Sequence, residues 1–185
     1  MNFGLYNLKY SARKWLFWIL PYMEKINPNW VSLLLLPIGL CIAYFYWADR
    51  YILGSVFILL RLFFGTLDGL IAEHFKKGTA TGEILNRLTP EISDLLLMGV
   101  LAWKDPSWGI LALIVAWLTT FSGLIGLAVK KPIQSVGPVG QTDRLAALIL
   151  CSLIPLANPM RLFLIWTIFG GLLTIVLRLK RQFAR

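Results

Sequence analysis

Long apolar runs, separated by short polar stretches, dominate the hydrophobic pattern of the chain. Most of these runs are about 20 residues long, the length that an α-helix needs to cross the hydrocarbon core of a bilayer. One run is shorter, and its helix is expected to start earlier, in the Gly-rich loop before it. The pattern predicts six spanning helices, over residues 29–48, 51–72, 84–103, 108–129, 145–156 and 160–178.

The start of the chain has a different pattern. In residues 4–25, Trp, Leu, Phe and Ile are mixed with basic residues, which is typical of an amphipathic helix that lies in the membrane interface. The predicted fold is therefore an all-α, polytopic membrane protein. We expect an interfacial amphipathic helix in residues 1–27 and a six-helix transmembrane domain in residues 28–185.

Composition excludes a soluble domain. Hydrophobic residues make up 58% of the 185 positions, and a soluble domain of this length cannot bury so much apolar surface. The membrane lipids are therefore the first expected partner. A net charge of +9 would suggest nucleic acid in a soluble protein, but in a membrane protein it indicates orientation, and no nucleic-acid partner is expected. Cys41 and Cys151 lie inside apolar runs and are expected to be small hydrophobic residues.

The distribution of basic residues predicts the topology. If the N-terminus is cytoplasmic, fourteen of the eighteen Lys and Arg residues fall on the cytoplasmic side and three on the other. The remaining one, Arg61, lies within a span. Cytoplasmic loops of membrane proteins carry this excess of positive charge. We therefore expect a multi-pass protein of the inner (plasma) membrane with both termini in the cytoplasm.

Ionisable side chains inside spans are costly, so each one suggests a function. Arg61 and Asp68 are seven residues apart in the second predicted helix and share one face. Asn86, Pro90 and Asp94 share a face of the third, where we expect Pro90 to be tolerated near the first turn. A structural Arg–Asp pair or a snorkelling arginine explains the second helix as well as a functional site does.

Three motifs together resemble the CDP-alcohol phosphotransferase family. The family signature is D-x-x-D-G-x-x-A-R, eight residues, and G-x-x-x-D-x-x-x-D. The matching segment here is Gly65-x-x-Asp68-Gly69-x-x-Ala72-Glu73, eight residues, and Gly82-x-x-x-Asn86-x-x-x-Pro90. Upstream, Pro28–Ser32 resembles the P-N-x-[IV]-[ST] entry to the family's first span, and downstream, Gly137–Arg144 resembles the bacterial G-x-M-G-[KR]-x-[DE]-R segment. The three segments are in register and cover nearly the whole chain.

The resemblance implies a membrane enzyme that transfers a substituted phosphate from a CDP-alcohol, such as CDP-diacylglycerol, to an acceptor hydroxyl and releases CMP. In the family, the aspartates hold two Mg²⁺ or Mn²⁺ ions and the last aspartate is the base. The residues implicated here are Asp68 and Asp94 as catalytic residues, Asp68 and Asn86 as metal ligands, and Gly69, Ala72, Gly82 and Arg144 as binding residues.

The chain departs from the signature at the residues that carry its chemistry. Gly65, Asn86 and Pro90 replace three of the four aspartates, and Glu73 replaces the arginine. Glycine and proline offer no side-chain ligand, while asparagine offers a neutral oxygen. We therefore predict a degenerate active site, with Mg²⁺ or Mn²⁺ as cofactor if it is active and otherwise none.

Three hypotheses remain open at this point. The chain is an enzyme in which Asp94 or Glu91 replaces the lost base, or it is an inactive relative that binds a lipid or nucleotide or serves as a regulatory or complex subunit. The third, an unrelated transporter or scaffold, predicts that Asp68 and Gly82 do not converge in space. Arg144 is either a bidentate phosphate ligand or a helix-end arginine paired with Asp143.

Small residues in the apolar helices leave the oligomeric state open. Close helix packing at small residues would permit a homodimer, and it would equally serve packing within one chain. The glycines concerned are Gly123, Gly126, Gly170 and Gly171.

Overall fold

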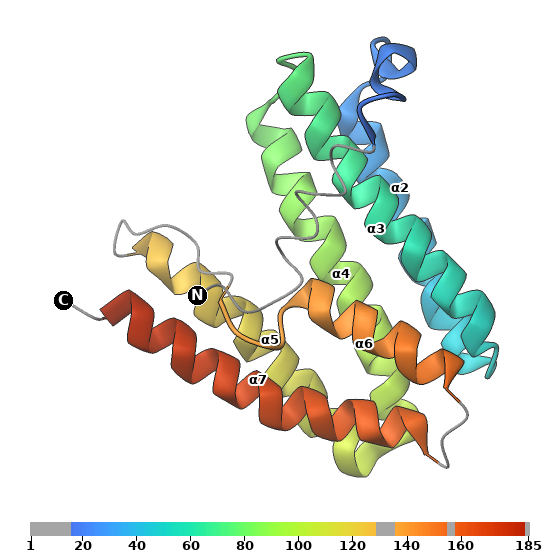
Figure 1. Ribbon diagram of the computed structural model, residues 1–185, viewed down its shortest axis with the longest axis vertical. Helices are drawn as coiled ribbons and strands as arrows, with labels where there is room; N and C mark the ends of the chain where they lie inside the picture. Colours follow the sequence, from blue (N-terminus) through green and yellow to red (C-terminus); the bar gives the residue numbers. More distant parts are fainter. Residues whose placement is uncertain (1–15, 129–135, 155–157, 184–185) are drawn as a thin grey trace. The chain divides into compact units, whose positions relative to one another are not determined.

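The computed structural model describes residues 16–128, 136–154 and 158–183, and every regular element within them is helical. The all-α prediction is confirmed for this part of the chain. The chain forms two compact units, with a border at residue 100. The elements, in chain order, are η1 (Leu20–Met23), α2 (Pro28–Trp47), α3 (Tyr51–His74), α4 (Ala80–Lys104), α5 (Pro106–Ala128), α6 (Gln141–Leu153) and α7 (Pro159–Phe183) (Figure 1).

In the first unit, α2 and α3 pack against each other as a hairpin (Figure 1). The Asn27 side chain accepts a hydrogen bond from the backbone N–H of Asn29 at 3.0 Å, and Pro28 occupies the first turn of α2. Both features favour a helix start. Asp49 has a positive φ of 59° in the short turn between the helices, and its carboxylate accepts a hydrogen bond from the Tyr51 hydroxyl.

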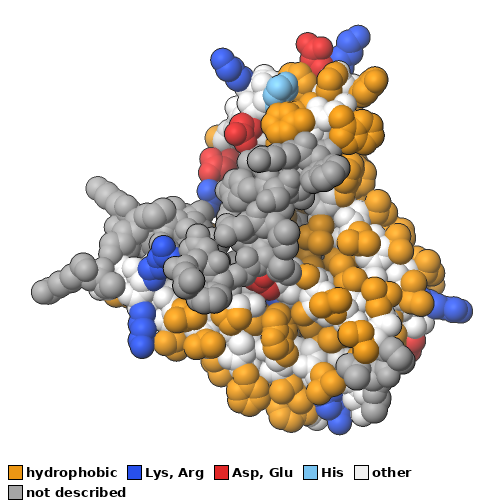
Figure 2. All heavy atoms as spheres, viewed as in Figure 1, with side chains coloured by type: hydrophobic (Ala, Val, Ile, Leu, Met, Phe, Trp, Pro, Cys, Tyr) orange, Lys and Arg blue, Asp and Glu red, His pale blue; other side chains and the backbone are white. Residues whose placement is uncertain are grey.

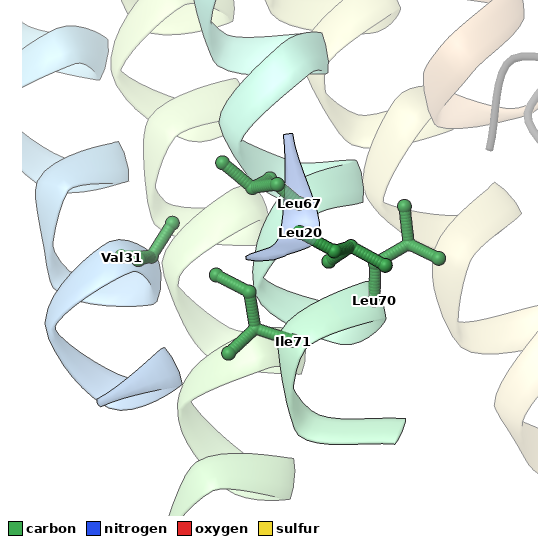
Figure 3. Packing of buried hydrophobic residues seen from close by; sticks show 5 residues of the cluster. All are labelled: Leu20, Val31, Leu67, Leu70 and Ile71. Carbon is green, nitrogen blue, oxygen red and sulfur yellow. The ribbon is translucent and has the colours of Figure 1, made fainter. Parts of the chain in front are cut away.

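The 3₁₀ helix η1 docks on this hairpin through Leu20. The Leu20 side chain is buried in a cluster with Val31, Leu67, Leu70 and Ile71 (Figure 3). The predicted amphipathic helix differs from the structure here. Residues 4–15 of that prediction lie outside the described part; in residues 16–25, Leu16 is helical and Leu20–Met23 form η1, with Pro21 in its first turn.

Helix α4 begins earlier than predicted. The Thr79 hydroxyl accepts a hydrogen bond from the Gly82 N–H at 3.0 Å and so caps a helix that starts at Ala80. Pro90 therefore lies in the helix interior, where its ring removes one backbone hydrogen bond. The expectation that Pro90 lies near the first turn is wrong, because the Thr79 cap starts the helix at Ala80, four residues before the apolar run begins.

In the second unit, α7 packs against both α5 and α6. Two glycines of α7 allow close contacts: a Cβ added to Gly171 would lie 2.5 Å from Val115 Cγ1 of α5, and one added to Gly170 would lie 2.5 Å from Cγ2 of Val139, in the segment before α6. These glycines serve packing within the chain. Helix α6 starts at Gln141 and reaches back into the Gly-rich segment, as expected for the short fifth run.

Four helices are long and apolar enough to cross a membrane: α2, α3, α5 and α7. The other two predicted spans are helical but differ in character, since α4 carries five charged residues and α6 has 13 residues. Hydrophobic side chains cover much of the visible described surface, and the Lys and Arg side chains on it are scattered (Figure 2). Crossing of the membrane by all six helices therefore stays a prediction.

Candidate functional site

The carboxylate of Asp68 in α3 is held by a contact with α2. Asp68 is only 1% exposed. Its Oδ2 accepts a hydrogen bond from Ser32 Oγ at 2.6 Å, and its Oδ1 accepts one from the backbone N–H of Gly69, also at 2.6 Å. Hydrogen bonds of this kind compensate the cost of burying an ionised carboxylate. Helix α2 thus supplies a hydroxyl group that orients Asp68.

One turn before Ser32, α2 makes a second contact with the signature segment. A Cβ added to Gly82 would lie 2.5 Å from Asn29 Oδ1. The start of α4 approaches this amide so closely that only glycine fits without a shift. Asn29 and Ser32 therefore join the entry of the first span to both halves of the signature. This convergence is contrary to what the unrelated-transporter hypothesis predicts.

A third contact joins α3 to α4. Arg61 is 4% exposed, and its Nη2 donates a hydrogen bond to the backbone carbonyl oxygen of Pro90 at 2.5 Å. Asp94, one turn further along α4, is also buried. The Arg61 guanidinium is therefore placed at the position of α4 where the family signature has its last aspartate.

Helix α4 also approaches α2 directly. A Cβ added to Gly39 would lie 2.5 Å from Ser93 Oγ and 3.0 Å from the Cα atom of Ser93. Burial along α4 increases away from its start: the Asn86 side chain is exposed, Pro90 and Glu91 are half-buried, and Ser93 and Asp94 are buried. The polar face of α4 thus passes from an open end into the packed interior of its unit.

The structure brings together some of the predicted site residues and leaves others apart. Asp68 and Gly82 take part in the contacts with α2, and Gly69 donates its backbone N–H to Asp68. Ala72 is half-buried, whereas Glu73 and Asn86 are exposed. Asn29 and Ser32 were recognised only as part of a motif, without a role. Their spacing of three positions at the start of an apolar helix is the signal that predicts one shared face.

Arg144 lies in the second unit, near the start of α6. It is 1% exposed, and its backbone N–H donates to the Gly140 carbonyl oxygen at 3.0 Å. The Asp143 carboxylate accepts a hydrogen bond from the Gly140 N–H at 2.8 Å and caps α6. The positive-inside distribution of basic residues does not by itself explain an arginine that is buried to this extent.

The second unit contains a buried polar group of residues that sequence analysis missed. Arg178, interpreted above as one of the cytoplasmic basic residues, is buried and donates hydrogen bonds to the carbonyl oxygens of Val136 at 2.8 Å and Thr119 at 2.5 Å. Gln182 Nε2 donates to the carbonyl oxygen of Ser122 at 2.9 Å. The spacing of polar residues every fourth position in α7, from Thr174 to Gln182, is the signal that indicates this buried stripe.

The donor set does not fit the pair of divalent cations that the resemblance implies. Within the described residues, no group of three or more His, Cys, Asp and Glu side chains could hold a metal ion. All nine acidic residues, the histidine and both cysteines of the chain lie within that described part. Asp68 and the exposed Asn86 are the donors that remain at signature positions, and Gly65 and Pro90 contribute none. Such cations need several hard oxygen ligands.

Comparison with known proteins shows the fold. No protein-family model matches the chain. The chain is 28% identical over 139 residues to the inner membrane protein YnbA of Escherichia coli (strain K12). The match covers 71% of this chain and 68% of YnbA.

Solved structures of Mycobacterium tuberculosis phosphatidylinositol phosphate synthase (PgsA1) are similar over nearly the whole chain. The structure with CDP-DAG bound has a TM-score of 0.75 at 16% identity and covers 96% of this chain and 94% of its own. The structure in complex with manganese and citrate has a TM-score of 0.76 at 16% identity and covers 95% and 89%. The chain therefore has the fold of this synthase.

Proposed function

We propose that this chain is a multi-pass inner-membrane protein of phospholipid biosynthesis, similar to the CDP-alcohol phosphatidyltransferases, with a degenerate active site. The observation that carries the proposal is the similarity in fold to a synthase structure with CDP-DAG bound, over 96% of the chain. The contacts of Asn29 with Gly82 and of Ser32 with Asp68 support it, because they join residues of two of the motifs. The proposed ligand is a CDP-linked alcohol such as CDP-diacylglycerol.

The reaction of such a site is a displacement at phosphorus. The acceptor hydroxyl oxygen forms a bond to the phosphorus that carries the alcohol, the bond from that phosphorus to the CMP oxygen breaks, and CMP leaves with the electron pair. The hydroxyl proton passes to a base. Asp94 is the proposed base, since Pro90 occupies the usual position and cannot accept a proton. Asp68 is proposed to position the substrate together with Gly69, Ala72 and Gly82 of the same signature.

Arg144 is the proposed ligand for a phosphate of the acceptor alcohol. A guanidinium group makes paired hydrogen bonds to phosphate oxygens, and burial at 1% exposure would strengthen them. Replacing Arg144 by lysine would keep the charge and lose the paired geometry. We expect this variant to weaken binding of a phosphorylated acceptor and leave CDP-diacylglycerol binding unchanged.

The second candidate function is an inactive relative that binds a CDP-alcohol or a phospholipid and acts as a regulatory or complex subunit. The set of possible metal ligands favours it. Gly65, Asn86 and Pro90 replace three signature aspartates, and the described residues contain no group of three or more His, Cys, Asp and Glu side chains that could hold a metal ion. Loss of a positioned base alone slows a reaction by about 10²–10⁴-fold. The two candidates share the fold and the ligand and differ in turnover.

One experiment separates the candidates. Purified protein in lipid nanodiscs is mixed with CDP-diacylglycerol and a panel of acceptor alcohols, and both binding and CMP release are measured, with Asp68→Asn and Asp94→Asn variants alongside. Binding with slow CMP release that both substitutions abolish supports the enzyme. Binding without release supports the inactive relative. Folded protein that neither binds CDP-diacylglycerol nor releases CMP contradicts the proposal.

A further inference from the structure

Three ionisable side chains are buried within the described parts of α2, α3 and α4: Arg61, Asp68 and Asp94. Charges inside a membrane-spanning bundle are costly unless other charges or hydrogen bonds offset them. Arginine remains protonated under all ordinary conditions. The first unit therefore carries, as part of its own chain, one permanent positive charge and two carboxyl groups, all three of them buried.

The contact between Arg61 and Pro90 places this charge at the signature. Arg61 Nη2 lies 2.5 Å from the Pro90 carbonyl oxygen, and Pro90 occupies the position of the last aspartate in the family signature. Asp94 lies one helical turn, about 6 Å, further along the same helix. The guanidinium thus contacts the backbone of the residue that replaces the last aspartate of the signature.

The same region has lost the groups that would attract divalent ions. Gly65 and Pro90 have no side-chain oxygen, and the Asn86 side chain is neutral and exposed. Two divalent cations and Arg61 would bring five positive charges to this region, more than its buried carboxyl groups, Asp68 and Asp94, and the half-buried Glu91 can offset. Repulsion between like charges is strong where the effective dielectric constant is low.

We infer that the site between α2, α3 and α4 functions without a divalent cation, and that the guanidinium of Arg61 supplies its positive charge. The inference rests on the proposed function only for the identity of the ligand. Its consequence is that binding of a phosphate-bearing ligand does not depend on Mn²⁺ or Mg²⁺.

The test is a titration of metal-free protein with Mn²⁺, followed by electron paramagnetic resonance and by the melting temperature. Wild-type protein is expected to bind no Mn²⁺ at this site and to keep its melting temperature. Arg61→Gln leaves two buried carboxyl groups without the guanidinium, so we expect it to melt at a lower temperature and Mn²⁺ to raise that temperature by several degrees. Arg61→Lys keeps the charge and is the matched control, with no response to Mn²⁺.

A second variant keeps the test decisive if Arg61→Gln does not fold. Restoring the aspartates with Gly65→Asp, Asn86→Asp and Pro90→Asp is expected to create Mn²⁺ binding at least about tenfold tighter than any residual binding measured for the wild-type protein, since carboxylate charge sets such affinity. The backbone leaves room for this change: a Cβ added to Gly65 would lie 3.7 Å from Leu35 Cδ1, an ordinary contact. Asn86 is exposed, and replacing Pro90 restores a helical N–H.

The outcomes that overturn the inference are specific. Stoichiometric Mn²⁺ on the wild-type protein contradicts a metal-free site, and a folded Arg61→Gln variant with wild-type stability and no metal response contradicts the role of Arg61. CDP-diacylglycerol binding is compared in Mn²⁺ and in EDTA, and equal affinity is expected. Absence of any CDP-diacylglycerol binding would count against the proposed function, while the Mn²⁺ titration would still decide the present inference.

Discussion

Ser32 Oγ donates a 2.6 Å hydrogen bond to Asp68 Oδ2, and both side chains are buried. The bond joins residues 36 positions apart in the chain and links α2 to α3. A carboxylate held in this way has little freedom to reorient. The residue that the resemblance singles out most strongly is therefore also a structural link of the first unit.

Replacing Ser32 by alanine removes this link. Because the partner is a buried carboxylate, we expect Ser32→Ala to lower the free energy of unfolding by about 1.5–3 kcal/mol. Chemical or thermal unfolding in detergent measures the loss. Ser32→Thr, which keeps the hydroxyl group, should retain most of the stability.

Ser93→Ala is the second control for that measurement. The Ser93 hydroxyl is buried but makes no hydrogen bond within the described part of the chain. Its removal should be neutral or slightly stabilising. If Ser32→Ala and Ser93→Ala change the free energy of unfolding equally, the hydrogen bond from Ser32 to Asp68 makes no specific contribution to stability.

Two helical glycines of the first unit are expected to respond oppositely to alanine. A Cβ at Gly39 would meet the Ser93 side chain at 2.5 Å and the Ser93 Cα atom at 3.0 Å, so the helix backbones must separate. We expect Gly39→Ala to destabilise the protein by about 1–3 kcal/mol.

At Gly65 the same change meets only Leu35, with a nearest contact of 3.7 Å. Gly65→Ala should therefore be neutral, or stabilising by up to about 1 kcal/mol, since alanine favours a helix. The two variants are compared in one unfolding assay. Equal destabilisation at both positions would contradict the close approach of α2 and α4 at Gly39.

Arg178 is expected to stabilise the second unit. Its guanidinium bridges the carbonyl oxygens of Val136 and Thr119, and each such bond from a charged donor contributes about 1.5–3 kcal/mol. Arg178→Gln should lower the melting temperature markedly. Lys180→Ala, which changes an exposed side chain on the same helix, should not. A loss at Lys180 as large as that at Arg178 would indicate that charge alone matters.

The predicted topology can be tested by labelling of single cysteines. In a background without Cys41 and Cys151, Lys104→Cys at the end of α4 should react with a membrane-impermeant maleimide added to intact cells. Gly78→Cys should react only after the membrane is opened, because its loop is predicted to be cytoplasmic. A Cβ at Gly78 meets no atom within 4 Å, so the substitution is tolerated. The reverse labelling pattern would show the opposite orientation.

The amino-acid sequence by itself determined which parts of the chain are helical. Apolar runs of spanning length and the polar turns between them predict the helices α2 to α7 to within a few residues at most of their ends. These are local properties. In the bilayer core, the backbone N–H and C=O groups of a long apolar run must be hydrogen-bonded within the protein, and an α-helix satisfies them inside the run itself. The spacing of the signature, from Asp68 to Gly82, is likewise visible without a structure.

Tertiary packing decided which polar side chains meet. Sequence spacing places Arg61 and Asp68 on one face of α3, but only the structure shows that Arg61 donates to the Pro90 carbonyl and that Ser32 donates to Asp68. It also decided that Arg178 is buried. Helical periodicity states which residues share a face. The partner of that face depends on how closely two helices approach, which small residues such as Gly39 and Gly82 determine through contacts between distant parts of the chain.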